Sequence, residues 1–509
     1  MPFIDLNTQN SIDQYANADF IIIGAGAAGI LLAVKLTEKG KKVVVIESGH
    51  FNVDDEKQKL NEVISLTKVL NTAVYGRFRA IGGTTVRWGG GSSSFSKIDF
   101  QQREWVSNSG WPISYEEVLC YYDEVNKFMQ IDERLNFLNI NDPGFNPGLL
   151  DFHICKWAPE PNFQKIYKKY LQKNVAVIYN AVLQQLSYQN SNVENISISN
   201  FKNKIFIIKS KCIILAAGGI ECNRILLSNP YSEDTNKRSN LLGKMFMEHP
   251  SICVGAVKSK EYWQLQKIFN THFFKHAKYS IRLNLSEQLQ KENKVLNCTA
   301  GIMLENAIGE DPYSEIKNLR TNFSVKRLLK ISKFIPTLIK TFYALVIHKF
   351  IYKPEAEAKL VLMAEQEPLS ESYIALSKDC DSFGIPKAEI SWSISNLSWK
   401  TIVLSSFMIK KEIERLGLGE VIINKDIYYD NTDWLNLVSD VNHHMGGVRM
   451  SNTQDNGVVD TNLKLWGIDN LYVCSSAVFP TGSHSNPTAT MLALGLRLVD
   501  FLTGKSKNI

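Results

Sequence analysis

The sequence predicts an α/β fold built around a parallel sheet. A strand–turn–helix–strand pattern between Asp19 and Glu47 is the main observation behind this prediction. The length of 509 residues provides enough chain for two substantial cores, or for one large domain with an insert. A content of 44% hydrophobic and 21% charged residues is ordinary for folded proteins, so a disordered chain is not expected.

The elements of this unit follow one another closely. Phe20–Ile23 is a short apolar run rich in β-branched residues, which is typical of a buried parallel strand. A helix is expected over Ile30–Lys39 and should stop at Gly40. The second strand, Lys42–Ile46, then ends at Glu47.

A glycine-rich turn, Gly24-Ala25-Gly26-Ala27-Ala28-Gly29, joins the first strand to the helix. Gly24 permits a tight turn, Gly26 lets backbone amides approach a pyrophosphate, and Gly29 lets the helix pack closely on the strand. The start of the helix carries partial positive charge that favours an anion. Glu47 lies 18 residues after Gly29, where an acid accepts hydrogen bonds from an adenosine ribose. The unit therefore predicts a Rossmann-like dinucleotide site, although by itself it does not distinguish FAD from NAD.

Further motifs carry a resemblance to a known family. They are Arg79-Ala-Ile-Gly-Gly-Thr-Thr-Val-Arg-Trp-Gly-Gly90, Glu248-His-Pro250, His443-His-Met-Gly-Gly-Val-Arg-Met450 and Asn486-Pro-Thr488. With them the chain resembles the glucose–methanol–choline (GMC) oxidoreductases, and it is most similar to their bacterial sugar-dehydrogenase-like branch. The resemblance covers nearly the whole chain and is weakest between about Cys253 and Tyr352. It implies a discontinuous Rossmann-like FAD-binding domain and an α+β substrate domain with an antiparallel sheet.

The same resemblance implies a catalytic pair. The first histidine of the family's H-x-x-G-x-x-R-M motif acts as the base, and the spacing to Arg449 assigns that role to His443 rather than His444. The family's second catalytic position, a histidine or an asparagine, falls on Asn486. A histidine suits proton transfer near neutral pH, and a carboxamide offers both a donor and an acceptor without charge.

Other histidines have less specific roles in this interpretation. His444 is expected to be structural, and His249 is expected to be structural or to lie beside the cofactor. His484 lies two residues before Asn486, which leaves open that it lines the pocket.

The family cofactor is FAD, so the resemblance selects FAD over NAD. No histidine occurs between Leu70 and Glu104, the stretch where some members attach the flavin, and non-covalent binding is therefore expected. Ser475 replaces an aspartate that many members have, so that cofactor contact is not assigned. The expected cofactor-contacting residues are Gly24, Gly26, Ala28, Gly29, Glu47, Gly82, Gly83, Thr84, Thr85, Trp88, Val182, Ala217, Ser476, Ala477, Pro487 and Thr488.

The expected domain boundaries follow from the order of these motifs. Residues 1–155 and 156–255 form the first two parts of the FAD-binding domain, and residues 436–509 form the third part with the catalytic pair. Residues 256–435 form the substrate domain, which includes a basic insert at 316–354.

The resemblance implies that the reaction is removal of a hydride from an alcohol carbon, and that the substrate is a small sugar-like molecule or polyol. The sequence leaves the electron acceptor open. Two alternatives remain: a non-redox FAD-containing lyase of the same family, and a membrane-associated variant that acts on a lipid-linked substrate.

Charge and hydropathy limit the partners. The net charge of +6 is not concentrated in basic tails, so nucleic-acid binding is not expected, and no metal-ligand cluster is expected either. Because there is no signal-like start and no run of 18 apolar residues, a cytoplasmic location is predicted.

The insert at 316–354 contains nine lysines and arginines and no acidic residue. Apolar and basic side chains repeat in it with helical spacing, and Pro336 should kink a continuous helix. One interpretation is an interfacial segment resting on an anionic membrane, which would make the location peripheral. The other is an insert that packs its apolar side on the substrate domain and exposes its lysines.

Overall fold

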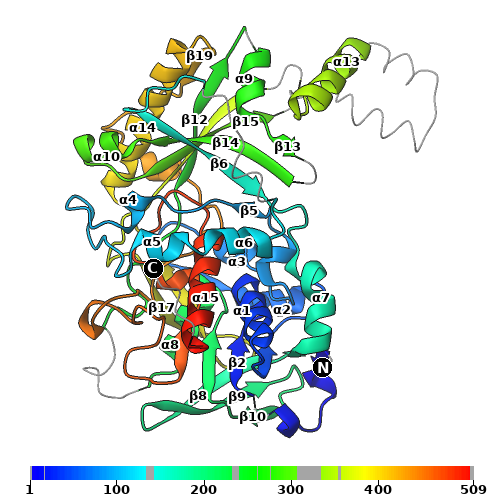
Figure 1. Cartoon of the computed structure of the whole chain (residues 1–509). Helices are drawn as coiled ribbons and strands as arrows, with labels where there is room; N and C mark the ends of the chain where they lie inside the picture. Colours follow the sequence, from blue (N-terminus) through cyan, green and yellow to red (C-terminus); the bar gives the residue numbers. More distant parts are fainter. Residues whose placement is uncertain are drawn as a thin grey trace.

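A computed structural model of the chain describes residues 3–15, 18–132, 143–231, 240–260, 262–274, 277–305, 334–353 and 357–504. Two sheets dominate the molecule and lie at opposite ends of it (Figure 1).

The first sheet is parallel and has six strands in the order β1-β7-β3-β2-β11-β20. Its central strands β2 and β3 are continuous apolar runs, and every residue of both strands is buried in one large hydrophobic core. Its strands are β1 Phe3–Asp5, β2 Phe20–Ile23, β3 Val43–Ile46, β7 Ala176–Tyr179, β11 Cys212–Leu215 and β20 Leu471–Val473. The chain enters this sheet from three distant stretches, as expected for a discontinuous domain.

Helix α1 (Ala27–Glu38) follows β2 through the glycine turn and packs against α7 (Phe163–Asn174) and α15 (Thr488–Leu502). The predicted strand Phe20–Ile23 is confirmed residue for residue. The helix begins three residues earlier than predicted, because Ala27, Ala28 and Gly29 of the turn already adopt helical geometry.

The second sheet is antiparallel, with eight strands in the order β19-β12-β16-β15-β14-β6-β5 and β13 paired to β14. Helix α14 (Asn396–Arg415) packs on one of its faces. The strands are β5 Gly91–Ser92, β6 Leu150–Trp157, β12 Ser251–Lys258, β13 His272–Phe274, β14 Ala277–Leu285, β15 Cys298–Glu305, β16 Glu357–Ala364 and β19 Glu420–Ile423. The predicted α/β fold class with an antiparallel sheet in its second domain is confirmed.

Alternation along these strands separates a core face from an open face. On β15, Ala300 and Ile302 are buried in the core beneath α14, whereas Thr299 and Met303 line a cavity. Neighbouring side chains in a strand point to opposite faces, so this period of two places a row of side chains opposite the parallel sheet.

The boundaries expected from the sequence at 155/156 and 255/256 fall within β6 and β12. Two smaller sheets complete the structure: β8 Val182–Gln189, β9 Asn192–Ser199 and β10 Ile205–Ile208 form one, and β4 Val63–Ser65, β17 Tyr373–Cys380 and β18 Pro386–Ser391 form the other. The other α-helices in the described ranges are α2 Asp55–Gln58, α3 Thr72–Tyr75, α4 Lys97–Phe100, α5 Tyr115–Leu119, α6 Tyr122–Phe128, α8 Gly219–Ser228, α9 Tyr262–Phe269, α10 Glu287–Asn293 and α13 Ile335–Tyr343.

Candidate active site

A cavity of about 810 Å³ lies between the two sheets and is lined by both halves of the predicted site. His443 and Asn486 line it, although they come from separate segments near the end of the chain. Gly29, Gly82 and Ala477 do not line it. The predicted cofactor residues that do are Gly24, Gly26, Ala28, Glu47, Gly83, Thr84, Thr85, Trp88, Val182, Ala217, Ser476, Pro487 and Thr488.

The glycine turn packs too tightly for side chains. Gly24 has a φ of +104°, and a Cβ atom there would lie 2.7 Å from the carbonyl oxygen of Ala216. A Cβ at Gly29 would lie 1.9 Å from the Gly24 oxygen, so the helix can approach the turn only without a side chain. No side chain caps the start of α1 at Gly26, which leaves its first amides available beside the cavity.

Glu47 holds this turn in place. Its carboxylate accepts hydrogen bonds from the Ala25 amide at 2.8 Å and the Gly49 amide at 2.7 Å. Burial raises the pKa of Glu47, while the two amide bonds favour the ionised form and oppose that rise. The acid at the end of β3 therefore also orders the turn before α1.

The second glycine-rich stretch docks directly on the first. The Gly82 amide donates to the Ala25 oxygen at 2.8 Å, and a Cβ at Gly83 would lie 2.7 Å from the Gly26 Cα. Gly82 therefore stabilises the glycine turn through this hydrogen bond, although it does not itself line the cavity. Thr85 donates from its hydroxyl to the Gly82 oxygen at 2.6 Å, which fixes the loop.

His443 lines the cavity, and a second histidine, His249, contacts it from outside the cavity lining. Main-chain hydrogen bonds between Met247 and Met445, both 2.8 Å, align the two segments that carry His249 and His443. The imidazole Nδ1 atoms of the two histidines lie 2.9 Å apart. The sequence suggested a structural or cofactor-adjacent role for His249, and its contact with His443 was not foreseen.

Hydrogen-bond partners determine the tautomers of this pair. The Nε2 atom of His249 lies 3.1 Å from the Gly482 carbonyl oxygen, which can only accept, so this nitrogen carries the proton. Burial lowers the pKa of His249 to about 4, so its Nδ1 is a bare acceptor at neutral pH. The proton shared between the rings therefore belongs to Nδ1 of His443, and Nε2 of His443 keeps a free lone pair.

Glu248 fixes the main chain of this pair. Its carboxylate accepts the His443 amide at 2.7 and 2.9 Å and the His249 amide at 2.8 Å. Burial raises the pKa of Glu248 to about 8, against the effect of these amides. Burial also lowers the pKa of His443 well below 6.5, which keeps its ring neutral.

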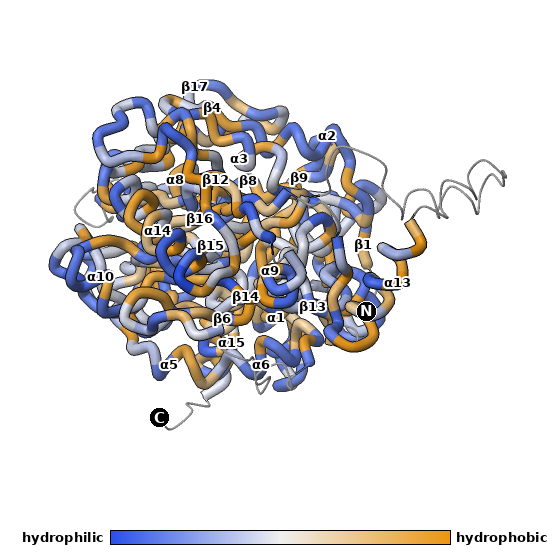
Figure 2. Tube along the Cα trace, turned by 90° about the horizontal axis from the view of Figure 1, so that it is seen from above, coloured by the Kyte–Doolittle hydropathy of each residue, from blue (hydrophilic) through white to orange (hydrophobic). Residues whose placement is uncertain are grey.

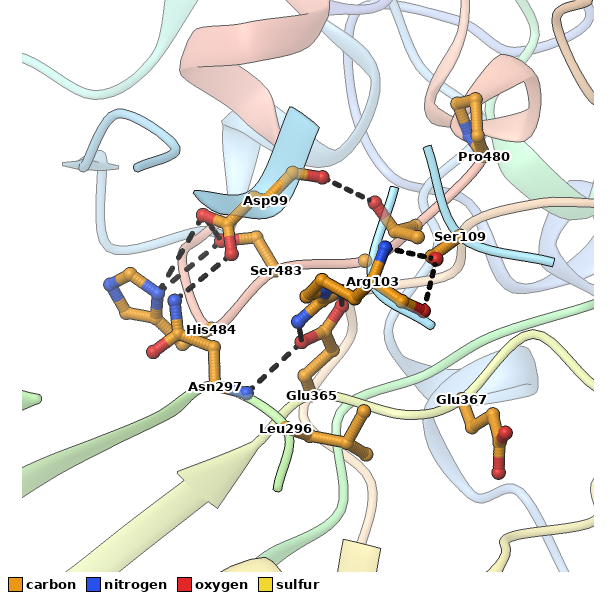
Figure 3. Close-up of polar contacts among 12 residues, drawn as sticks. Asp99, Arg103, Ser109, Leu296, Asn297, Glu365, Glu367, Pro480, Ser483 and His484 are labelled. Atoms are coloured by element: carbon orange, nitrogen blue, oxygen red, sulfur yellow. Dashed lines mark hydrogen bonds and ion pairs between the residues drawn. The ribbon is translucent and has the colours of Figure 1, made fainter. Parts of the chain in front are cut away.

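The loop before Asn486 is held by a buried polar network (Figure 3). The Ser483 hydroxyl donates to the Asp99 carboxylate at 2.6 Å, and the Thr481 hydroxyl donates to the Asp99 carbonyl oxygen at 2.8 Å. The buried Arg103–Glu365 ion pair, with contacts of 2.7 and 2.5 Å, lies beside it. The network connects this loop to α4 and to the antiparallel sheet.

The side chain of Asn486 is left open to a ligand. Within the part of the chain that the structure describes, neither its carboxamide nor Nε2 of His443 has a hydrogen-bond partner. His484 also lines the cavity, but its Nε2 accepts from the Asn284 amide at 3.0 Å, so it is tied to β14.

The sequence did not predict a cluster of arginines around Glu221 in the wall of the cavity. Glu221 forms ion pairs with Arg79 at 2.9 Å and Arg224 at 3.0 Å, and Arg77 lies 3.8 Å away. These arginines hold the pKa of Glu221 at about 2 although it is buried. The two pairs Arg77/Arg79 and Glu221/Arg224 lie more than 140 residues apart in the sequence, so only the fold brings them together.

Two family profiles match the chain. The profile described as FAD binding domain matches residues 19–53, which include the glycine turn and Glu47. The profile described as GMC oxidoreductase matches residues 368–495, which include His443 and Asn486.

Two relatives match the chain over almost their full length. The chain is 22% identical to a 2-methyl-1,2-propanediol dehydrogenase of Mycolicibacterium austroafricanum, covering 98% of this chain and 97% of the relative. It is also 22% identical to the fructose dehydrogenase large subunit of Gluconobacter japonicus, covering 97% and 99% of the two chains.

Solved structures share the fold. Pyridoxine 4-oxidase from Mesorbium loti aligns with a TM-score of 0.58 and 13% identity over 96% of this chain and 100% of its own. Formate oxidase from Aspergillus oryzae aligns with a TM-score of 0.57 and 14% identity over 96% and 98%. The chain therefore contains an FAD-binding domain and a GMC oxidoreductase domain, is similar to GMC-type oxidoreductases over nearly its full length, and is an FAD-dependent oxidoreductase.

Proposed function

We propose that the protein removes a hydride from an alcohol carbon of a small sugar-like or polyol substrate, with His443 as general base and Asn486 orienting the hydroxyl. The observation that supports this proposal is that Nε2 of His443 and the Asn486 carboxamide, neither of which has a hydrogen-bond partner among the described residues, line the same cavity as the glycine turn.

The cavity fits FAD. The uncapped start of α1 at Gly26 would hold the pyrophosphate, and Glu47 and Val182 would face the adenosine half. Thr84, Thr488 and the residues around them would hold the remainder beside the catalytic pair. When bound, FAD supplies the hydride acceptor.

The residues of the chain perform the proton chemistry. Nε2 of His443 accepts the hydroxyl proton, and the positive charge that develops on the ring is stabilised through its Nδ1–H bond to His249. Asn486 donates to the substrate oxygen and so limits the directions in which the carbinol hydrogen can point. Pro487 restricts the backbone of Asn486 and thereby its side chain.

The sheet face of the cavity favours a polyhydroxylated substrate. Within the described chain, Nδ1 of His153 and the hydroxyl of Thr299 are buried and have no hydrogen-bond partner. Arg282 and Trp157 line the same wall. Buried polar atoms without partners are rare, so these groups are suited to bind substrate hydroxyls. The two relatives named above for a diol and a sugar support the same class.

An anaerobic substrate screen tests the proposal. Purified holoprotein is mixed with fructose, 2-methyl-1,2-propanediol, other sugars and simple monoalcohols, and the yellow flavin band is followed. A diol or sugar should bleach the flavin in wild type, and the His443→Gln variant should keep its FAD but bleach at least about 1000-fold more slowly. Product formation without bleaching would instead indicate a non-redox lyase.

A further inference from the structure

Helix α13 (Ile335–Tyr343) and the π-helix η7 (Ala344–His348) expose an unusual set of side chains at the edge of the molecule (Figure 1). We call the exposed apolar group formed by Ile335, Ile339, Phe342, Leu345, Val346 and Ile347 the α13 surface; each of these residues is between 42% and 69% exposed. Large contiguous apolar patches are uncommon on proteins that do not bind a partner there.

In this segment the large apolar side chains face the solvent instead of the body of the protein. The residues that face inward are small or polar: Thr341 is 7% exposed and Ala344 is fully buried. Phe342 between them is 69% exposed. An insert that packs its apolar side on the substrate domain would show the opposite arrangement. The exposed side chains of α13 and η7 do not follow that interpretation, whereas Phe350 after them is fully buried; residues 316–333 lie outside the described part of the chain.

Aromatic packing against α9 and a hydrogen bond hold this segment in place, so the α13 surface is exposed because of the way the chain folds here. Trp263 of α9 packs its ring against Tyr343, Phe350 and Tyr352, with centroid distances of 5.9, 5.4 and 5.4 Å. The Thr341 hydroxyl donates to the backbone carbonyl oxygen of Tyr352 at 3.3 Å. These contacts hold the inner side of α13 and leave the α13 surface outward, where Figure 2 shows hydrophobic colouring on α13 at the rim of the molecule.

Charge indicates which partner covers this surface. Lys340 and Lys349 are exposed beside it, and no acidic residue occurs between 316 and 354. We infer that the α13 surface inserts its apolar side chains into the headgroup region of an anionic membrane while these lysines contact lipid phosphates. A surface that binds another protein usually carries charges of both signs, whereas this segment combines exposed apolar side chains with lysines and contains no acidic residue, as expected for contact with an anionic bilayer.

The contact is peripheral. None of the described helices combines the length and apolar character needed to cross a bilayer, and α13 has only nine residues, or about 14 Å. Lys353, just after the surface, donates to the Leu304 oxygen at 2.6 Å, at the end of β15 that also carries the cavity residue Met303. Membrane binding would therefore bring this end of the antiparallel sheet near the lipid. The inference does not depend on the proposed reaction.

Vesicle co-sedimentation of the full-length holoprotein tests the inference. We expect binding to vesicles of phosphatidylcholine with phosphatidylserine, weakened by salt, and much weaker binding to phosphatidylcholine alone. The double variant Ile339→Glu/Phe342→Glu should lower the partition coefficient by about tenfold or more. A matched control, Ile205→Glu/Ile207→Glu, changes two apolar residues of β10 that are 63% and 61% exposed, and should bind as wild type does.

Two results would overturn the inference. One is equal sedimentation of wild type and the α13 double variant with anionic vesicles. The other is concentration-dependent self-association that the α13 double variant abolishes, in a protein that ignores vesicles, since the surface would then join two copies of the chain.

Discussion

Replacement of His249 by leucine should slow substrate oxidation strongly although His249 is not proposed to touch the substrate. His249 is fully buried, and its Nδ1 lies 2.9 Å from Nδ1 of His443. Leucine removes the acceptor, so the Nδ1–H group of His443 loses its partner and the ring no longer has a fixed tautomer.

The magnitude follows from the charge that His443 gains. A hydrogen bond to a charged group contributes about 1.5–3 kcal/mol, which corresponds to a loss of about 10- to 150-fold in rate. Because the bond strengthens as the ring becomes positive, the loss should fall on the rate constant of flavin reduction, while substrate affinity changes little. Stopped-flow measurement of anaerobic flavin bleaching over a range of substrate concentrations separates the two quantities.

A second substitution distinguishes this positioning role from a structural one. In His249→Asn, the side-chain oxygen occupies nearly the place of Nδ1 and can accept the same proton, so it should restore part of the rate. His272→Leu serves as the control, because His272 is a buried histidine whose Nδ1 bonds to the Asn270 oxygen at 2.9 Å outside the cavity. If His249→Leu retains FAD and reduces it at the wild-type rate, or if leucine and asparagine are equally slow, the tautomer argument is refuted.

Three further predictions concern other parts of the cavity. Asn486→Ala should lower the rate constant of flavin reduction by about 10- to 100-fold at unchanged FAD content, because one hydrogen bond to the reacting oxygen is lost; an unchanged rate would exclude its role. Glu47→Gln should weaken FAD binding by a similar factor, measured by release of fluorescent flavin, because an amide group would then face a backbone N–H of the turn. Glu221→Gln should lower the free energy of unfolding at pH 7 by about 3–5 kcal/mol, seen in denaturant titrations, because it removes the charge that compensates buried arginines.

The pH dependence of Glu221 has a defined sign. Its folded-state pKa of about 2 lies below the ordinary value of 4.5, so the stability it contributes is present above pH 4.5 and is lost as the pH falls through about 2. The difference in unfolding free energy between wild type and Glu221→Gln should therefore shrink over this window. A difference independent of pH would show that the arginine cluster does not act through this charge.

The sequence was sufficient to predict those parts of the fold whose structure depends on residues that are neighbours in the chain. The strand Phe20–Ile23 and the turn after it could be predicted because burial on both faces and missing side chains leave a local signature. The start of α1 was misjudged by three residues, because the same glycine turn is compatible with helical geometry from Ala27 onward.

The contacts that tune the site could not be predicted in the same way. His249 and His443 are 194 residues apart, and Arg103 and Glu365 are 262 residues apart. No periodicity links such positions, so only the three-dimensional arrangement shows that they meet. The outward direction of the apolar side of α13 was also undetermined, because amphipathic spacing is identical whether the apolar side faces a core or a lipid surface.

The tautomer of His443 is the most direct test of the catalytic account. Nitrogen NMR of protein labelled with ¹⁵N-histidine, assigned by the signal that disappears in His443→Gln, reports which ring nitrogen carries the proton. We expect a proton on Nδ1 and a bare Nε2 at neutral pH, persisting below pH 6.5 because burial lowers the pKa of this ring. A proton on Nε2 of His443 in the resting protein would contradict the account, since this nitrogen could not then accept the proton of an alcohol.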